Sequence, residues 1–361
     1  MMKKLTKKRF LFLLPMAACA VMLAGCDEKK EEPKPETSAQ PVEVVQESGE
    51  ECLQRAIDKL SADEIDAADA AVKKALELLP DSAEALLVDG QVAYRKGDLE
   101  RAMKAFNAVA SEKSLSEALR AEALVARAVA EIKQGNFDTA RLTLFRALHL
   151  NRRNAAVWYH LGLLSRNNYH FDEVAVEQFE MAARLSDPKD ERIKKISQEL
   201  RAARAAVTAA AAANPNAEKR DAGAAARLLG EAEALRKKRM IRAAIKKYEA
   251  AFAADPFSYP AARETAYLLS LNDKTSAGVD KALLAYRAAI DQRPAVQDNY
   301  YAAAQLAYAN QRWATTVSIL DRAIAHDPEN IKTLDLFIAA LQKAGRGKQS
   351  EAWKAYRQEL K

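Results

Sequence analysis

One short pattern of residues returns along most of the chain at a nearly constant interval. Each copy has a small residue, a bulky apolar residue four positions later and an Ala or Val three positions after that, often followed by a proline. The copies are Ala68-Val72-Ala75-Pro80, Ala102-Phe106-Val109, Ala140-Leu144-Ala147, Ala175-Phe179-Ala182, Ala244-Tyr248-Ala251-Pro256, Ala282-Tyr286-Ala289-Pro294 and Thr316-Leu320-Ala323-Pro328. Their first residues lie 34, 38, 35, 69, 38 and 34 positions apart. A period near 34 predicts an all-α fold, a solenoid of about seven to eight helix–turn–helix repeats in two arrays.

The spacing also indicates how the helices pack. Small residues allow two antiparallel helices to approach closely, and the Phe, Tyr or Leu between them fills the groove to the next pair. Proline then ends the second helix, because it lacks the backbone N–H. Since no single pair can bury its apolar face alone, stacking of pairs must supply the core.

The first helix of a repeat has its own signature, which is clearest in Trp158-Tyr159-His160-Leu161-Gly162 and partial elsewhere. Turn signals agree with it in Lys96-Gly97-Asp98 and Gln134-Gly135-Asn136-Phe137. Together with the repeated pattern, these residues resemble the tetratricopeptide repeat family over roughly residues 51–361. The resemblance implies a scaffold that recognises proteins or peptides on a concave surface.

The interval of 69 residues would hold one more repeat, and it divides the chain. Ile193, Ile196, Leu200, Ala203 and Val207 fall on one face of a helix, so residues 189–212 could close a first array as a capping helix. The expected partner helix is then interrupted by Asn214-Pro215-Asn216. We therefore predict an N-terminal array over 51–207 with its capping helix, a linker over 208–222 and a C-terminal array over 223–361 with a terminal cap.

The N-terminus has the organisation of a secretory signal. Five basic residues stand within the first nine, and Phe10 to Leu23 is an apolar run interrupted only by Pro15. The run is shorter than the roughly 18–20 residues that a membrane-spanning helix needs, so we expect residues 1–25 to be cleaved.

The residues at the expected cleavage site, Leu23-Ala24-Gly25-Cys26, resemble the lipobox of bacterial lipoproteins. The resemblance implies that Cys26 carries a diacylglyceryl group and becomes the new N-terminus. Residues 26–50 are then read as a disordered tether, because they are charged and contain proline but almost no bulky apolar residues. In enteric bacteria, lipoproteins of this kind with an aspartate after the cysteine, as in Asp27, tend to stay in the inner membrane.

Removal of the signal also changes the charge of the chain. The full sequence has a formal net charge of +6, from 56 basic and 50 acidic residues. Residues 1–25 hold five of the basic residues and no acidic ones, so the mature chain would carry 51 against 50, a net charge of +1. A net charge so small gives no reason to expect nucleic acid as a partner.

The sequence carries little sign of catalytic chemistry. Cys19 leaves with the signal and Cys26 is the lipid site, so Cys52 is the remaining cysteine, and we interpret it as a small packed residue. The histidines, at 149, 160, 170 and 326, have no metal-ligand spacing, and neither a phosphate-binding glycine loop nor a nucleophile elbow is present. We expect no cofactor, no metal and no enzyme activity.

Aligning the repeats predicts which side chains line the concave surface. Tyrosine and arginine predominate at these positions, and both are common at protein interfaces. The candidates are Tyr94, Tyr159, Arg166, Arg236, Arg263, Tyr267, Tyr301 and Tyr308. Any one of them could instead be a packing residue of a solvated face, and the C-terminal tyrosines are the stronger candidates.

The sequence thus predicts a scaffold anchored by lipid in the bacterial cell envelope, facing the periplasm, that binds envelope proteins or peptides. An envelope hydrolase or transferase with its site between the two arrays is the alternative. A self-associating structural protein is a third possibility.

Overall fold

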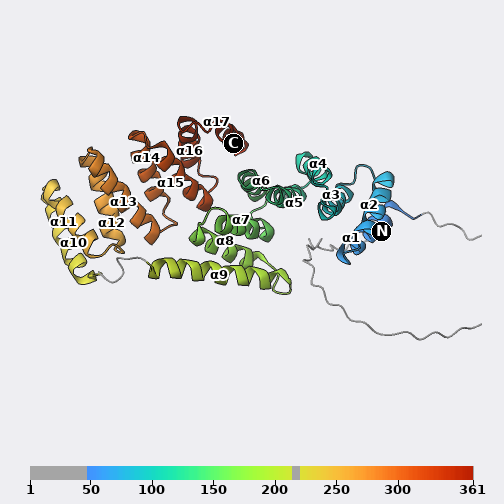
Figure 1. Ribbon diagram of the computed structural model, residues 1–361, viewed down its shortest axis with the longest axis horizontal. Helices are drawn as coiled ribbons and strands as arrows, with labels where there is room; N and C mark the ends of the chain where they lie inside the picture. Colours follow the sequence, from blue (N-terminus) through green and yellow to red (C-terminus); the bar gives the residue numbers. More distant parts are fainter. Residues whose placement is uncertain (1–46, 214–219, 361) are drawn as a thin grey trace, which may run out of the picture. The chain divides into compact units, whose positions relative to one another are not determined.

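The computed structural model describes residues 47–213 and 220–360, and this part of the chain consists of 17 α-helices with no β-strand (Figure 1). The predicted all-α fold is therefore confirmed. None of the described helices combines the length and apolar character that crossing a bilayer requires. The predicted signal peptide, Cys26 and the tether residues up to 46 lie outside the described residues, whereas Gly49 and Glu50, predicted as the end of the tether, begin the first described helix.

The described residues divide into two compact units, one up to Ala130 and the other from Glu131 onward, and α5 crosses the division. The described helices of the first unit are α1 (Gly49–Ser61), α2 (Ile65–Leu78), α3 (Ala83–Lys96), α4 (Leu99–Ser111) and most of α5 (Glu117–Lys133). Those of the second unit are α6 (Phe137–Leu150), α7 (Ala155–Asn167), α8 (Asp172–Leu185), α9 (Arg192–Ala212), α10 (Ala222–Lys237), α11 (Ile241–Ala254), α12 (Tyr259–Asn272), α13 (Ser276–Gln292), α14 (Gln297–Ala309), α15 (Trp313–His326), α16 (Ile331–Lys343) and α17 (Gly347–Glu359). The boundary predicted at 208–222 stays a prediction, since residues 214–219 lie outside the described part.

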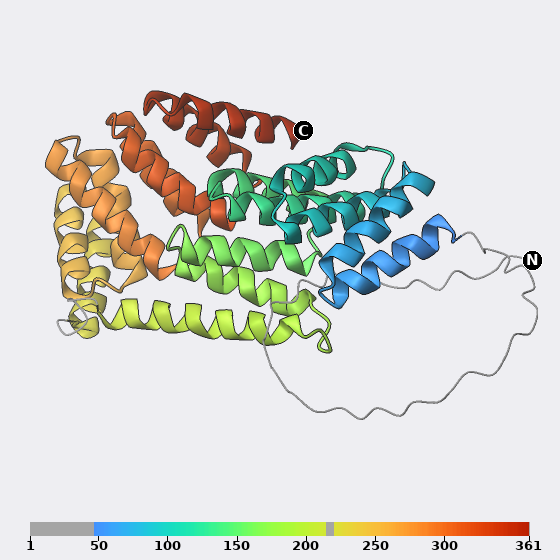
Figure 2. The ribbon, with the colours of Figure 1, turned by 45° about the vertical axis from the view of Figure 1, so that its right-hand side comes forward.

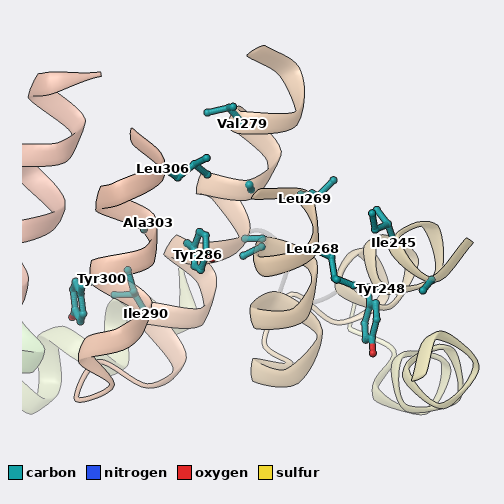
Figure 3. Close-up of a cluster of buried hydrophobic side chains, with 14 of the residues drawn as sticks. Ile245, Tyr248, Leu268, Leu269, Val279, Tyr286, Ile290, Tyr300, Ala303 and Leu306 are labelled. Carbon is teal, nitrogen blue, oxygen red and sulfur yellow. The ribbon is translucent and has the colours of Figure 1, made fainter. Parts of the chain in front are cut away.

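Consecutive helices pack in pairs, and the repeated pattern forms the contact between them. The first residue of every copy is completely buried, and the bulky residue four positions later is at most 3% exposed, from Val72 in α2 to Leu320 in α15. In the second unit one cluster of buried side chains runs through α10–α15, with Tyr248 and Tyr286 pointing between neighbouring helices (Figure 3). The packing predicted from the spacing is present.

The turn within a repeat contains a residue with left-handed backbone. Glycine holds this position in several repeats, including the predicted turns at Gly97 (φ 84°) and Gly135 (φ 79°). Residues with side chains hold it in others, at Asp63, His170, Arg239 and Gln311. Left-handed backbone costs such residues roughly 1–2 kcal/mol, because Cβ approaches the following carbonyl oxygen. The turn geometry is therefore set by the repeat, not by the residue that occupies it.

Helix α9 stands apart from the pairs and lies along α8 (Figure 2). Of the face predicted for it, Ile196 and Ala203 are buried and Leu200 is partly buried, whereas Val207 is 36% exposed. Its 21 residues span about 31 Å at 1.5 Å per residue, but the 14 residues of α8 span only about 21 Å. The end of α9 therefore extends beyond the helix that it covers.

Helices before and after α9 also meet inside the second unit. The Gln178 side chain of α8 donates a hydrogen bond to the carbonyl oxygen of Ala325 in α15, at 3.2 Å. Arg141 of α6 forms an ion pair with Asp321 of α15 at 2.6 Å, and its guanidinium lies 4.1 Å from the centre of the Tyr169 ring. The repeats on the two sides of α9 are thus joined by polar contacts that the repeated pattern does not encode.

The contact between glycine and an aromatic ring gives the first prediction. A Cβ atom on Gly162 of α7 would lie 2.6 Å from Cε1 of Phe179, whereas one on Gly230 of α10 would meet nothing within 4 Å. We expect Gly162→Ala to lower the free energy of unfolding by about 1–3 kcal/mol, because the buried ring has to move. Gly230→Ala, the control, should raise it by up to about 1 kcal/mol through helix propensity. Urea denaturation of both variants checks this, and equal stabilities would contradict the packing described.

Candidate protein-binding surface

The C-terminal repeats bring two of the predicted arginines together. Arg236 of α10 and Arg263 of α12 both form ion pairs with Glu264 of α12, at 3.1 Å and 2.6 Å. Each arginine side chain is 47% exposed, and that of Glu264 is 18% exposed. The cluster keeps one net positive charge, and its guanidinium groups can reach a carboxylate from solvent. Because each arginine side chain is about half exposed, an external carboxylate can bind the cluster beside Glu264 without displacing it.

The exposed face of α12 continues from this cluster as a stripe. Arg263, Tyr267 and Leu271 follow each other at intervals of four residues, so they lie on one side of the helix. Tyr267 is 45% exposed and Leu271 is 53% exposed. The opposite face of the helix, including Ala262 and Leu269, is buried in the repeat core. We call Arg263, Tyr267 and Leu271 the α12 stripe.

Sequence reasoning missed Leu271. The alignment of repeats predicted Arg263 and Tyr267, but Leu271 was not among the positions that it assigned to the concave surface. The signal for Leu271 was its spacing of four residues from Tyr267, which places both on one helix face. An exposed leucine is unremarkable alone, but beside an exposed tyrosine it forms a continuous apolar surface.

The tyrosines of α14 are less accessible than those of α12. Tyr301 and Tyr308 are both only partly exposed. The Tyr308 ring contacts Trp313 edge to face, with ring centroids 4.9 Å apart, while Tyr300 beside them is buried in the core. Tyr308 therefore also has a packing role, which was the other interpretation of these residues.

In α7 the predicted residues contact the chain's own helix α9. Arg166 forms an ion pair with Glu199 of α9, and Tyr159 packs against the buried cluster that includes Ala203 of the same helix. Burial raises the pKa of the Tyr159 hydroxyl. Helix α9 of the same chain therefore already contacts both of these predicted groove residues.

Tyr94 belongs to the first unit. It packs at the edge of the core cluster formed by α3, α4 and α5, and burial raises the pKa of its hydroxyl. The predicted surface residues therefore fall into three places: Tyr94 in the first unit, Tyr159 and Arg166 beside α9, and the remaining five on α10, α12 and α14.

Comparison with known protein families matches two segments, residues 53–118 and 125–188, to the tetratricopeptide repeat. They include the first four copies of the repeated pattern, which supports the resemblance found from the residues. Comparison with curated proteins finds no match.

Solved tetratricopeptide structures are similar to the chain at low identity. One is the TPR2AB domain of yeast Sti1 in complex with pHSP90, which is 16% identical with a TM-score of 0.26, and the match covers 85% of this chain and 98% of that one. Another is a tetratricopeptide repeat protein from Parabacteroides merdae, which is 13% identical with a TM-score of 0.33, covering 81% and 98%.

Tetratricopeptide repeats are generally scaffolds without catalytic activity, which favours a binding role for this chain. In the part of the chain that the structure describes, no three His, Cys, Asp or Glu side chains gather as a metal site. Cys52 is buried in α1, and burial, followed by a hydrogen bond with Glu47, raises the pKa of its thiol. A raised pKa makes this thiol a poor nucleophile.

His160 provides a prediction about pH. Burial, assisted by the positive charge of Arg192, lowers its pKa from 6.5 to about 4. A pKa lowered by folding means that protonation favours the unfolded chain, so this contribution to stability is complete above pH 6.5 and is lost as the pH falls towards 4. We expect a loss of about 2–3 kcal/mol over that interval.

Denaturation by urea at a series of pH values measures this loss. In the variant His160→Gln, the free energy of unfolding should depend less on pH. The control, His170→Asn, replaces an exposed histidine whose left-handed backbone (φ 56°) asparagine tolerates, and it should leave the dependence unchanged. A parallel pH dependence in all three proteins would show that His160 does not titrate as described.

Proposed function

We propose that this protein is a membrane-anchored scaffold of the bacterial cell envelope that binds partner proteins or peptides on its C-terminal repeats. The observation that carries the proposal is the α12 stripe, where an arginine, a tyrosine and a leucine are exposed in line on a repeat scaffold. Tetratricopeptide repeats supply a rigid array of helices, and function then depends on what their exposed faces present.

The chemistry of the α12 stripe indicates the kind of partner. Arg236 and Arg263 offer forked donors that match a carboxylate, while Tyr267 and Leu271 offer apolar area beside them. A peptide segment with an acidic residue next to bulky apolar residues meets both requirements. Tyrosine gives this contact area at low entropic cost, because it has only two side-chain torsions.

The proposed anchor and location rest on the N-terminal sequence. Lipid on Cys26, in the context Leu23-Ala24-Gly25-Cys26, would hold the protein at a membrane facing the periplasm, with the inner membrane slightly favoured by Asp27. Several acyl chains are needed for stable anchoring, since each buried CH₂ contributes only about 0.8 kcal/mol. The predicted tether between Cys26 and the start of α1 at Gly49 would span on the order of 25–30 Å and so keep the repeats accessible to partners.

The α12 stripe is tested by its effect on partner binding. The mature chain, produced without lipid, is immobilised and exposed to envelope extract, and the bound proteins are quantified by mass spectrometry. We expect the double variant Tyr267→Ala, Leu271→Ala to lose a specific partner, because truncating central interface side chains weakens binding by about 2 kcal/mol or more. The same purified partner should then bind at least about 30-fold more weakly in calorimetry.

The matched control is Leu284→Ala on α13, which removes a leucine that is 62% exposed but lies outside the α12 stripe. It should retain every partner. If the double variant binds the same proteins with the same affinity as the unchanged chain, the α12 stripe is not the binding surface.

The anchor is tested separately in cells. We expect the native chain to incorporate radiolabelled fatty acid and to fractionate with membranes, whereas Cys26→Ser should do neither. A second variant, Cys52→Ser, controls for loss of a cysteine as such and should still be labelled. Labelling that survives Cys26→Ser would place the lipid elsewhere or reject the anchor. Density fractionation of Asp27→Ser beside the native chain reports which membrane is used.

A further inference from the structure

The turn between α10 and α11 concentrates positive charge. Residues 236–247 read Arg-Lys-Lys-Arg-Met-Ile-Arg-Ala-Ala-Ile-Lys-Lys, with seven basic residues and no acidic one. We call this segment the basic turn. It stands out because the proposed mature chain is almost neutral, so the concentration is local and not a general property of the protein.

Most of this charge has no ion-pair partner among the residues that the structure describes. Arg236 pairs with Glu264, and Lys247 pairs with Glu231 at 2.6 Å. The other five basic residues are exposed, and no described carboxylate lies within ion-pair distance of them: Lys237, Lys238, Arg239, Arg242 and Lys246. Unpaired, solvated cations of one sign create a potential that attracts an external anion.

Local stability does not explain these residues. Basic residues are favourable in the last turn of a helix, as for Arg236 and Lys237 in α10, but Arg242 stands in the first turn of α11, where the helix dipole favours acids. Arg239 holds the left-handed turn position (φ 57°), which glycine holds in three other repeats and residues with side chains hold in three more. Sequence choices that oppose local preference are expected where a surface has a function.

An exposed apolar side chain lies at the centre of the charge. Met240 is 52% exposed, although its neighbours Leu235 and Ile241 pack against the core of the array. The turn is thus held in place by inward-facing side chains on both sides, and Met240 is directed outward among the cations. An apolar tip surrounded by basic residues is the composition of segments that lie in the interface of an anionic bilayer.

We infer that the basic turn binds the surface of a bilayer that contains anionic phospholipid. The inference rests on the proposed function in one respect, because a lipid anchor keeps the repeats close to a membrane. Nucleic acid is the less favoured partner, since single strands are bound by aromatic stacking and the basic turn contains no Phe, Tyr or Trp. A bilayer contact at α10 and α11 would orient the repeats relative to the membrane that anchors them.

The test uses the mature chain without lipid, which retains every described residue. Its flotation with vesicles of phosphatidylcholine and phosphatidylglycerol is compared with flotation with phosphatidylcholine alone. We expect binding only to the anionic vesicles and a steep loss of binding as salt is raised. The variant Lys237→Gln, Lys238→Gln, Arg239→Gly should bind on the order of a hundredfold more weakly, since each cation near an anionic surface strengthens binding about fivefold.

A matched triple variant controls for net charge. Lys343→Gln, Arg346→Gln and Lys348→Gln remove three exposed cations at the corresponding turn between α16 and α17, and should leave binding unchanged. Met240→Ser should weaken binding with no change in charge. Circular dichroism checks that each variant is folded, and glycine is the residue best suited to the backbone at 239.

Three results would overturn the inference: no preference for anionic vesicles, equal losses in the two triple variants, or tighter binding to a DNA oligonucleotide than to vesicles through the same residues. Because the chain in this test carries no lipid, failure here leaves the proposed anchor and the α12 stripe unaffected. Equally, if the native chain is not labelled by fatty acid, binding of the basic turn to vesicles in this test still supports the inference.

Discussion

The close approach of paired helices is the constraint on which the rest of this structure depends. In α3 and α7 the approach is so close that a glycine replaces alanine and the ring of Phe106 or Phe179 fills the space that a Cβ atom would take. Each pair buries one face in this way and stacks on the next. Since the core occupies only one face of each helix, the remaining faces are free to differ between repeats.

This constraint also decides how much the sequence could predict. Residues of the core recur with the period of the repeat, so their burial, the helix pairs and the turns at Gly97 and Gly135 follow from spacing alone. The polar contacts between the repeats on the two sides of α9 cannot be predicted from this spacing. Arg141 and Asp321 are 180 positions apart, and neither belongs to the repeated pattern. A contact between repeats that are distant in sequence leaves no periodic signal.

Those polar contacts favour the arrangement of helices seen in the second unit. The Arg141 side chain is only 5% exposed. Burial opposes its charge, but Asp321 and the Tyr169 ring compensate, so the pKa of the guanidinium remains above its ordinary value. A buried charge without such partners would cost several kcal/mol, and an alternative packing of the helices would leave it unpaired. Apolar contacts between alanine-rich helices discriminate less between alternative packings of the helices, because these contacts are similar in every repeat.

Contacts within the chain also distinguish the candidate site residues from one another. The sequence predicts groove residues both in α7, at Tyr159 and Arg166, and in α12, at Arg263 and Tyr267, but it does not show which of them another helix of the chain contacts. The difference arises from α9, which pairs Glu199 with Arg166, whereas the α12 stripe has no such cover among the described residues and its arginine is paired only with Glu264 in the same helix. A groove position that its own chain already contacts must release that contact before it can bind a partner. The α12 stripe avoids this cost, which is the physical reason to look for partners at the C-terminal repeats.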